Sequence, residues 1–299
     1  MEHLIEIIGW LALAGQLGAI GWIVGAIAVA VKLRHLQEVS HFAVHGVLTR
    51  TRKFGLVLTE ILVHVPLGYG SVSARRRTHV RQHHPNATVL GVDPNLEDLR
   101  RAGLTADCGP FRFALATVFP LTPRGIFHTG RTITVQNASK LTSRWRLVAF
   151  LAAPVAAVFL LGWPTAIACV IIPRILLYPQ LAWFSLLVEH RWFDAETVNG
   201  RPLDVEAARC LRLYSRRPAM ALLSRATWLP YGDLYHFAHS VHPAVRWNYL
   251  PALERIIGNP GFLPSGLLSG ATPLIRHHQR SLRSETVAVR SARSAASTT

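Results

Sequence analysis

The sequence predicts an all-α integral membrane protein with a helical cap on the cytoplasmic side that holds a histidine-rich metal site. Half of the residues are hydrophobic and only 16% are charged, whereas soluble domains carry about a quarter charged residues. The apolar residues form runs of membrane-spanning length, and nine of the fifteen histidines form four clusters outside those runs. We expect a membrane domain over residues 1–270 and a tail over residues 271–299.

The first apolar run covers residues 8–31 and contains no charged side chain. An α-helix rises about 1.5 Å per residue, so this run can cross the roughly 30 Å hydrocarbon layer. A cleaved signal peptide would begin with basic residues, but here Glu2 and Glu6 precede the run. The pattern therefore favours a transmembrane helix over about 8–31.

A second apolar region runs from residue 147 to residue 187 and carries a single charge, Arg174. Gly162, Trp163 and Pro164 interrupt it, and proline disfavours a continuing helix. The region predicts a transmembrane hairpin with arms at 147–162 and 165–187.

Residues 54–70 are also apolar but contain Glu60, His64 and Pro66. The histidines can meet only if they share one side of the bilayer, because metal–nitrogen bonds are about 2 Å long. The hairpin returns the chain to the side it left, so 54–70 is expected to be interfacial or re-entrant. Arginines flank the histidines, namely Arg75, Arg76, Arg77, Arg81, Arg209, Arg212, Arg216, Arg217 and Arg225. By the positive-inside rule this face is cytoplasmic.

The net charge of +16 comes mainly from arginines beside the apolar segments and in the tail. No nucleic-acid-binding module or stripe of aromatic and basic residues is evident. The charge therefore favours anionic lipid headgroups as partners, and not nucleic acid.

The three cysteines, Cys108, Cys169 and Cys210, form no CxxC pattern. Neither a disulfide framework nor a thiolate metal site is indicated. The tail is low in apolar residues and rich in Ser, Ala and Arg, so we expect it to be disordered and basic. In that case His277 and His278 are a solvated pair.

The histidines repeat at short helical steps. His41 and His45 are four residues apart and would share one helix face, so that both can bind one ion. His79 and His83 show the same step, and His84 would point about 100° further round the helix, toward a second metal.

A third set, His236, His239 and His242, is spaced by three residues, and His190 follows the hairpin. Each cluster alone also fits a solvated pair or a basic interfacial patch. Four clusters on one predicted face favour a single metal centre, since neutral imidazole binds iron, zinc and copper.

These clusters resemble the three histidine boxes of the membrane fatty acid desaturase superfamily, HxxxH, Hxx(x)HH and HxxHH. The chain reads HFAVHG at 41–46, HVRQHH at 79–84 and HFAHSVHP at 236–243. DPNLED at 93–98, EHRWF at 189–193 and HPAVRWNYLP at 242–251 are similar to other segments of that family. The resemblance covers about residues 30–260. It implies two iron ions bound by His41, His45, His79, His83, His84, His190, His236, His239 and His242.

Two positions depart from the family pattern. Phe42 follows the first histidine where relatives often have an acid, and Glu38 is the candidate replacement for that carboxylate. Ser240 stands where the third box has its second adjacent histidine. We expect either His242 to take over that coordination or one iron to be more open.

The resemblance implies a non-haem diiron oxidoreductase that uses O2 and external electrons to desaturate a fatty acyl chain or related lipid. A hydroxylase or ketolase of a lipid, carotenoid or secondary-metabolite acyl chain is the alternative. The substrate would be an acyl-CoA, an acyl-carrier-protein thioester or a phospholipid. The cysteines are too few for a fused iron–sulfur domain, so a separate ferredoxin or cytochrome would deliver electrons.

Two other classes of protein were considered. A zinc-dependent membrane hydrolase would need an HExxH motif, and the sequence contains none. A non-enzymatic metal carrier or membrane-surface protein is the remaining possibility.

Overall fold

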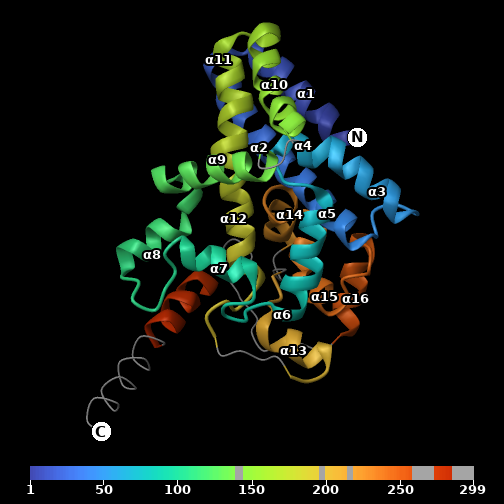
Figure 1. Cartoon of the computed structure of the whole chain (residues 1–299), viewed down its shortest axis with the longest axis vertical. Helices are drawn as coiled ribbons and strands as arrows, with labels where there is room; N and C mark the ends of the chain where they lie inside the picture. The colour runs from blue at the N-terminus through green and yellow to red at the C-terminus, as the bar shows by residue number, and fades with distance from the viewer. Residues whose placement is uncertain (139–143, 195–198, 214–217, 258–272, 285–299) are drawn as a thin grey trace.

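The computed structural model describes residues 1–138, 144–194, 199–213, 218–257 and 273–284 (Figure 1). Over these residues the chain forms helices, turns and loops, and its one β-type contact is an isolated antiparallel bridge between His190 and Cys210. The predicted all-α fold is confirmed.

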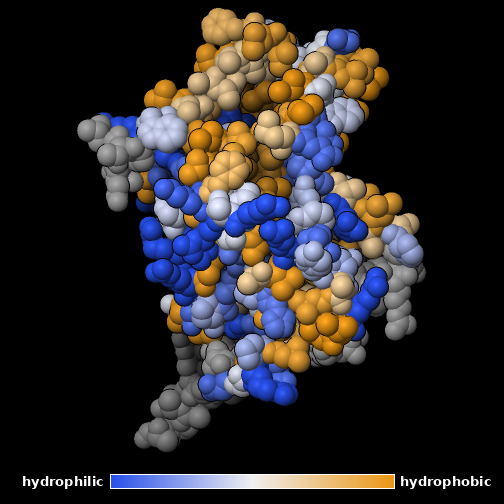
Figure 2. All heavy atoms as spheres, turned by 90° about the vertical axis from the view of Figure 1, so that its right-hand side faces the viewer, coloured by the Kyte–Doolittle hydropathy of each residue, from blue (hydrophilic) through white to orange (hydrophobic). Residues whose placement is uncertain are grey.

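One end of the molecule is an apolar helical bundle. Its helices are α1 (Glu2–Gln16), α2 (Gly18–His45), α10 (Arg144–Leu161), α11 (Trp163–Ala166) and α12 (Tyr178–Glu189). The π-helical segments Ile167–Ile171 and Pro173–Leu177 join α11 to α12. In Figure 2 hydrophobic residues dominate the surface of this end, and hydrophilic residues gather below it.

Three helices in the described chain are long and apolar enough to cross a membrane: Gly18–His45, Arg144–Leu161 and Trp163–Glu189. The last two coincide with the predicted hairpin arms. Trp163 and Phe159, near their shared turn, are 68% and 84% exposed, as expected for side chains that face lipid.

The run at 8–31 is not one helix. Gly18 has φ +60, a left-handed conformation that glycine adopts easily, and the chain reverses there. Lys32 and Glu6 form an ion pair at 2.7 Å, which places α1 antiparallel to α2. The helices are so close that a Cβ on Gly25 would lie 2.9 Å from the Cβ of Ala14. The prediction of a continuous span is therefore wrong, and the start of α1 lies beside the histidine-bearing end of α2.

Residues 54–70 lie mostly in a second bent unit. Helix Arg52–Leu67, which comprises α3 (Arg52–Thr59), the π-helical segment Glu60–His64 and α4 (Val65–Leu67), meets helix Val72–Asn86 at 100°. Phe54 and Ile61 are exposed on its outer side. An interfacial or re-entrant position remains the prediction for this segment.

The other helices form the rest of the described chain. They are α5 (Val72–Arg76), α6 (His84–Asn86), α7 (Pro94–Arg101), α8 (Pro110–Thr117), α9 (Pro123–Ala138), α13 (Pro202–Arg209), α14 (Pro218–Ala226), α15 (His236–Val241) and α16 (Leu250–Ile256). Short 3-10 turns lie at Phe119–Leu121, Asp233–Tyr235 and Trp247–Tyr249.

Buried Arg34 joins this region to the apolar bundle. It forms ion pairs with Asp233 and with Glu38, the latter at 3.5 Å. It also donates a hydrogen bond to Ser185 Oγ at 2.8 Å. Because these partners lie on α2, α12 and the turn before α15, one guanidinium fixes three elements relative to one another.

Part of the predicted tail is structured. Residues 273–284 form a helix in which Leu274, His278 and Leu282 are buried. His278 Nε2 donates to the Leu187 carbonyl at 2.9 Å, and burial lowers the pKa of His278 to about 4. The prediction of a disordered tail with a solvated histidine pair is wrong over these residues, while 285–299 lie outside the described residues.

Replacing Leu282 with Ala tests this packing. Leu282 is 1% exposed and contacts a core that includes Leu187 and Trp192. Loss of the buried side chain should cost about 2–5 kcal/mol and lower the melting temperature of the detergent-purified protein. Exposed Arg283 provides the matched control, Arg283→Ala. Equal melting temperatures for the two variants would contradict the docking of this helix.

Candidate metal centre

The first two histidines project from the end of α2. His41 Nδ1 donates to Glu38 Oε1 at 2.9 Å, so the carboxylate one turn earlier orients the ring. The Nε2 of His41 then lies 2.8 Å from the Nε2 of His79. The expected hydrogen bond from the ring to Glu38 is confirmed, and Phe42 instead packs against Ala238 and Leu250 in the core.

The second box lies on a π-helical turn, Arg77–His83. A π turn hydrogen-bonds at steps of five residues, so it brings His79 and His84 onto one face, with Nε2 atoms 3.2 Å apart. The His84 Nε2 also lies 3.1 Å from that of His45. The α-helical prediction that His79 and His83 act as a pair is therefore wrong, because the ligand atom of His83 groups with Glu189 and His190, although its ring stacks on that of His79.

The histidines of α15 also separate. The His239 ring lies 4.5 Å from that of His41 between centroids, whereas the His236 ring lies 4.8 Å from that of His190. The Nε2 atoms of His236 and His190 are 3.2 Å apart. His239 therefore joins the histidines of α2 and His236 joins His190, although the two are only three residues apart. The expectation that they share one face is wrong.

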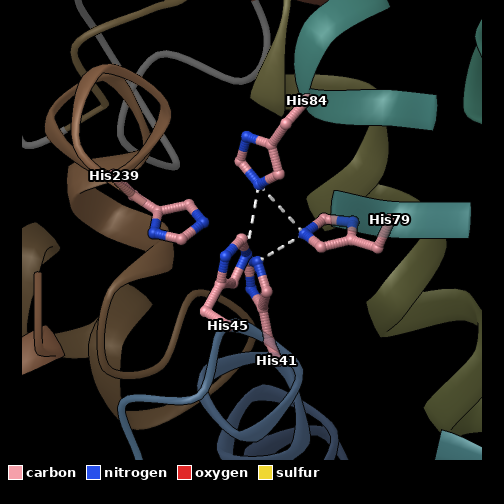
Figure 3. Close-up of side chains that lie close together, drawn as sticks. All are labelled: His41, His45, His79, His84 and His239. Carbon is pink, nitrogen blue, oxygen red and sulfur yellow. Dashed lines mark hydrogen bonds between the residues drawn. The ribbon is translucent and has the colours of Figure 1, made fainter. Parts of the chain in front are cut away.

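Five imidazoles form what we call the first histidine group. Each offers a ligand atom within 4.8 Å of the others: His41, His45, His79, His84 and His239. Figure 3 shows the five rings directed toward a common centre from α2, from the second box and from α15.

The second histidine group consists of His83, His190 and His236. His83 Nδ1 donates to Asp93 Oδ1 at 2.9 Å. Two backbone amides, those of Thr88 and Asn95, hold the same carboxylate. The two groups are adjacent, since the His83 and His84 ring centroids are 5.6 Å apart.

The donor atoms fit two metal ions. Among the described residues both ring nitrogens of buried His239 and the Nδ1 of buried His236 have no hydrogen-bond partner. Burial, reinforced by neighbouring imidazoles, holds the pKa of His190, His236 and His239 well below the usual histidine value. The rings are therefore neutral and keep a lone pair for a metal. Buried orphaned nitrogens around a common centre are the groups that an ion would satisfy.

His242 belongs to neither group. It is exposed beyond the last residue of α15, while Ser240 is buried. The expectation that His242 replaces the missing box histidine is not met, because the helix ends before residue 242 could return to the interior.

Three functional neighbours carried no assigned role in the sequence analysis. Asp93 lay within the DPNLED segment, but its contact with His83 depends on the loop between α6 and α7. Glu189 offers a ligand atom near His83 and His190. Cys210 was discounted for lack of a CxxC pattern, yet its Sγ lies 3.3 Å from His190 Nδ1.

A cavity of about 750 Å³ reaches the first histidine group. His41, His79, Glu38 and Glu189 line it together with apolar walls that include Leu67, Phe119 and Trp183. Basic residues also line it, among them Arg75, Arg101, Arg124 and Arg131. Phe127, also in the lining, is 72% exposed, so the cavity opens to the surface.

A family model described as fatty acid desaturase matches residues 20–267. The chain belongs to the fatty acid desaturase family. No curated protein matches the chain. Membership identifies an integral membrane oxidoreductase of the desaturase type, and its three apolar helices are the candidate spans.

His239 within α15 and His242 just beyond it provide a matched test. His239→Ala should lower the metal bound per purified chain, because His239 faces four other imidazoles. His242→Ala should leave the metal content unchanged, since its ring is exposed. Elemental analysis of both variants checks this. Metal loss in His242→Ala with retention in His239→Ala would refute the grouping.

Proposed function

We propose that this desaturase-family protein uses two irons, O2 and external electrons to desaturate a fatty acyl chain or related lipid. The observation that carries the proposal is the position of the first histidine group at the wall of the cavity. His41 and His79 belong to both. A substrate in the cavity would therefore lie beside the metal ligands.

Different side chains would bind the irons, orient the ligand rings and hold the acyl chain. The first and second histidine groups would each hold one iron, and the bound iron supplies oxygen activation. Glu38 and Asp93 hold the Nδ1 protons of His41 and His83, which leaves each Nε2 available to a metal. The apolar wall, including Trp183, would hold the acyl chain away from water.

The cavity lining also bears on the substrate. Arg101, Arg124 and Arg131 lie along the same cavity as the apolar wall. An acyl-CoA, an acyl-carrier-protein thioester and a phospholipid all combine an apolar tail with an anionic part. These are the substrate classes we propose. A separate acidic ferredoxin or cytochrome would dock on the basic surface and deliver electrons.

Lipid analysis of expressing cells tests the reaction. Cells with the wild-type protein, but not those with His239→Ala, should accumulate acyl chains two hydrogens lighter, and only in the presence of O2. Mass spectrometry with double-bond localisation would detect them. Hydroxylated or oxidised chains that depend on His239 would select the hydroxylase or ketolase alternative. Identical lipids in both strains, with iron bound, would contradict the proposal.

We also propose that the histidine groups face the cytoplasm. The arginines at this end support it, including Arg75, Arg77, Arg81 and Arg209 in the described chain. Arg216 and Arg217, part of the predicted positive-inside signal, lie outside the described residues.

Cysteine labelling tests this orientation. The three native cysteines are buried, so a membrane-impermeant thiol reagent should react only with an introduced one. Arg246→Cys, at an exposed site near the third box, should be labelled only after the cells are permeabilised. Trp163→Cys, in helix α11, which lies at the opposite end of the molecule from α15 (Figure 1), should react in intact cells. The reverse pattern would place the histidines outside.

A further inference from the structure

The second histidine group has fewer donors than the first. Its three imidazoles are connected through His190, whose ring centroid lies 5.3 Å from that of His83 and 4.8 Å from that of His236, whereas the first group has five imidazoles. Ser240 occupies the position that follows His239 in the third box. An iron held there by three imidazoles alone would have room for another ligand. Non-haem iron sites commonly combine histidines with a carboxylate.

Glu189 is the carboxylate placed to fill that position. It is the last residue of α12 and directly precedes His190. One of its oxygens lies within 4.8 Å of a ligand nitrogen of His83 and of His190. Glu189 also lines the cavity beside His41, so its carboxylate stands between the second group and the proposed substrate space.

The other acidic side chains around the histidines already have strong partners. Each accepts from a buried cationic or imidazole donor: Glu38 from His41, Asp93 from His83, and Asp233 from Arg34. These three carboxylates are used in holding rings and helices in place.

Glu189 has no such partner. Within the described chain its one hydrogen bond comes from Ser185 Oγ at 3.3 Å, and the same hydroxyl makes a shorter contact, 2.9 Å, with Asp233. No ion pair to Glu189 occurs among these residues. Glu189 is half-buried, and a partly desolvated carboxylate without an ion pair is costly. A bound metal ion would reduce that cost.

Cys210 is the rival fourth ligand, and its position argues against it. The Cys210 Sγ faces the Nδ1 of His190, whereas the Nε2 of that ring faces His236. The Cys210 Sγ lies within 4.8 Å of ligand atoms of both His190 and His236, but it is on the Nδ1 side of the His190 ring, and it donates to Glu206 Oε2 at 3.1 Å. Cys210 orients His190 from behind, in the way that Glu38 and Asp93 orient their histidines.

We propose that Glu189 is a carboxylate ligand of the metal in the second histidine group, beside His83 and His190, whose ligand atoms lie within 4.8 Å of its carboxylate. The inference rests on the proposed diiron function. It makes the two irons unequal, one bound by imidazoles alone and the other by imidazoles and one carboxylate.

Glu189→Gln tests the ligand directly, because it keeps the side-chain size and removes the charge. The wild-type protein, loaded with Mössbauer-active iron, should show two iron components. In Glu189→Gln one component should be lost or shifted and the other unchanged, with an affinity loss at that site of about 10- to 100-fold or more. Unchanged iron content and an unchanged spectrum would overturn the proposal.

Two further variants separate the alternatives. Cys210→Ser should keep both iron components, and loss of one there, with Glu189→Gln unaffected, would assign the ligand to the thiol. Glu189→Asp keeps the charge and should retain more of the affected component than Glu189→Gln. Equal loss in both would mean that the side chain acts through packing, and would also overturn the proposal.

The metal-free protein gives a readout that does not depend on loading. If Glu189 has no cationic partner apart from the metal, the iron-free Glu189→Gln variant should melt at the same temperature as the iron-free wild-type protein or higher. With iron present, the variant should melt at a lower temperature than the wild-type protein. A lower melting temperature in both states would identify a structural role. A wild-type protein that binds no pair of irons would instead refute the proposed function.

Discussion

The structure depends on satisfying eight buried or half-buried imidazoles that face one another. Neighbouring Nε2 atoms lie 2.8–3.2 Å apart in both groups, and a neutral ring has only one donor and one acceptor. Hydrogen bonds among the rings cannot satisfy every nitrogen, and His239 is left with none. Metal ions at the two centres would resolve this conflict. Because the ligands come from segments nearly 200 positions apart in the chain, metal binding would also contribute to folding.

The membrane helices provide the rigid frame for this site. α2 continues without a break from the apolar bundle to His45, and α12 leads directly into Glu189 and His190. Arg34 connects both helices to the turn that precedes α15. The long helices therefore place His41, His45 and His190, while the other five imidazoles lie on short helical segments. The cavity lies beside the same helices, so that the site and the space for an apolar substrate share one wall.

The sequence analysis predicted the all-α class, the hairpin arms and the convergence of eight of the nine histidines. These follow from long apolar runs and from short helical steps, which are local properties. The spacing predicted that His83 joins His79 and that His84 faces a second metal, whereas His84 joins His79 and His83 does not. This assignment was not predictable, because it depends on a π-helical turn at 77–83. The reversal at Gly18 was missed because a charge-free run has the same composition whether it is straight or folded back. His278 is buried only through contacts with Leu187, far away in the sequence.

The most direct test of the account is to locate the metals in the purified, iron-loaded protein by anomalous diffraction at the iron edge. The account predicts two neighbouring iron peaks. One should lie among the five imidazoles of the first histidine group, and the other should lie among His83, His190 and His236. A single peak, a peak at the zinc edge only, or iron bound elsewhere would contradict the diiron interpretation of this desaturase-family protein.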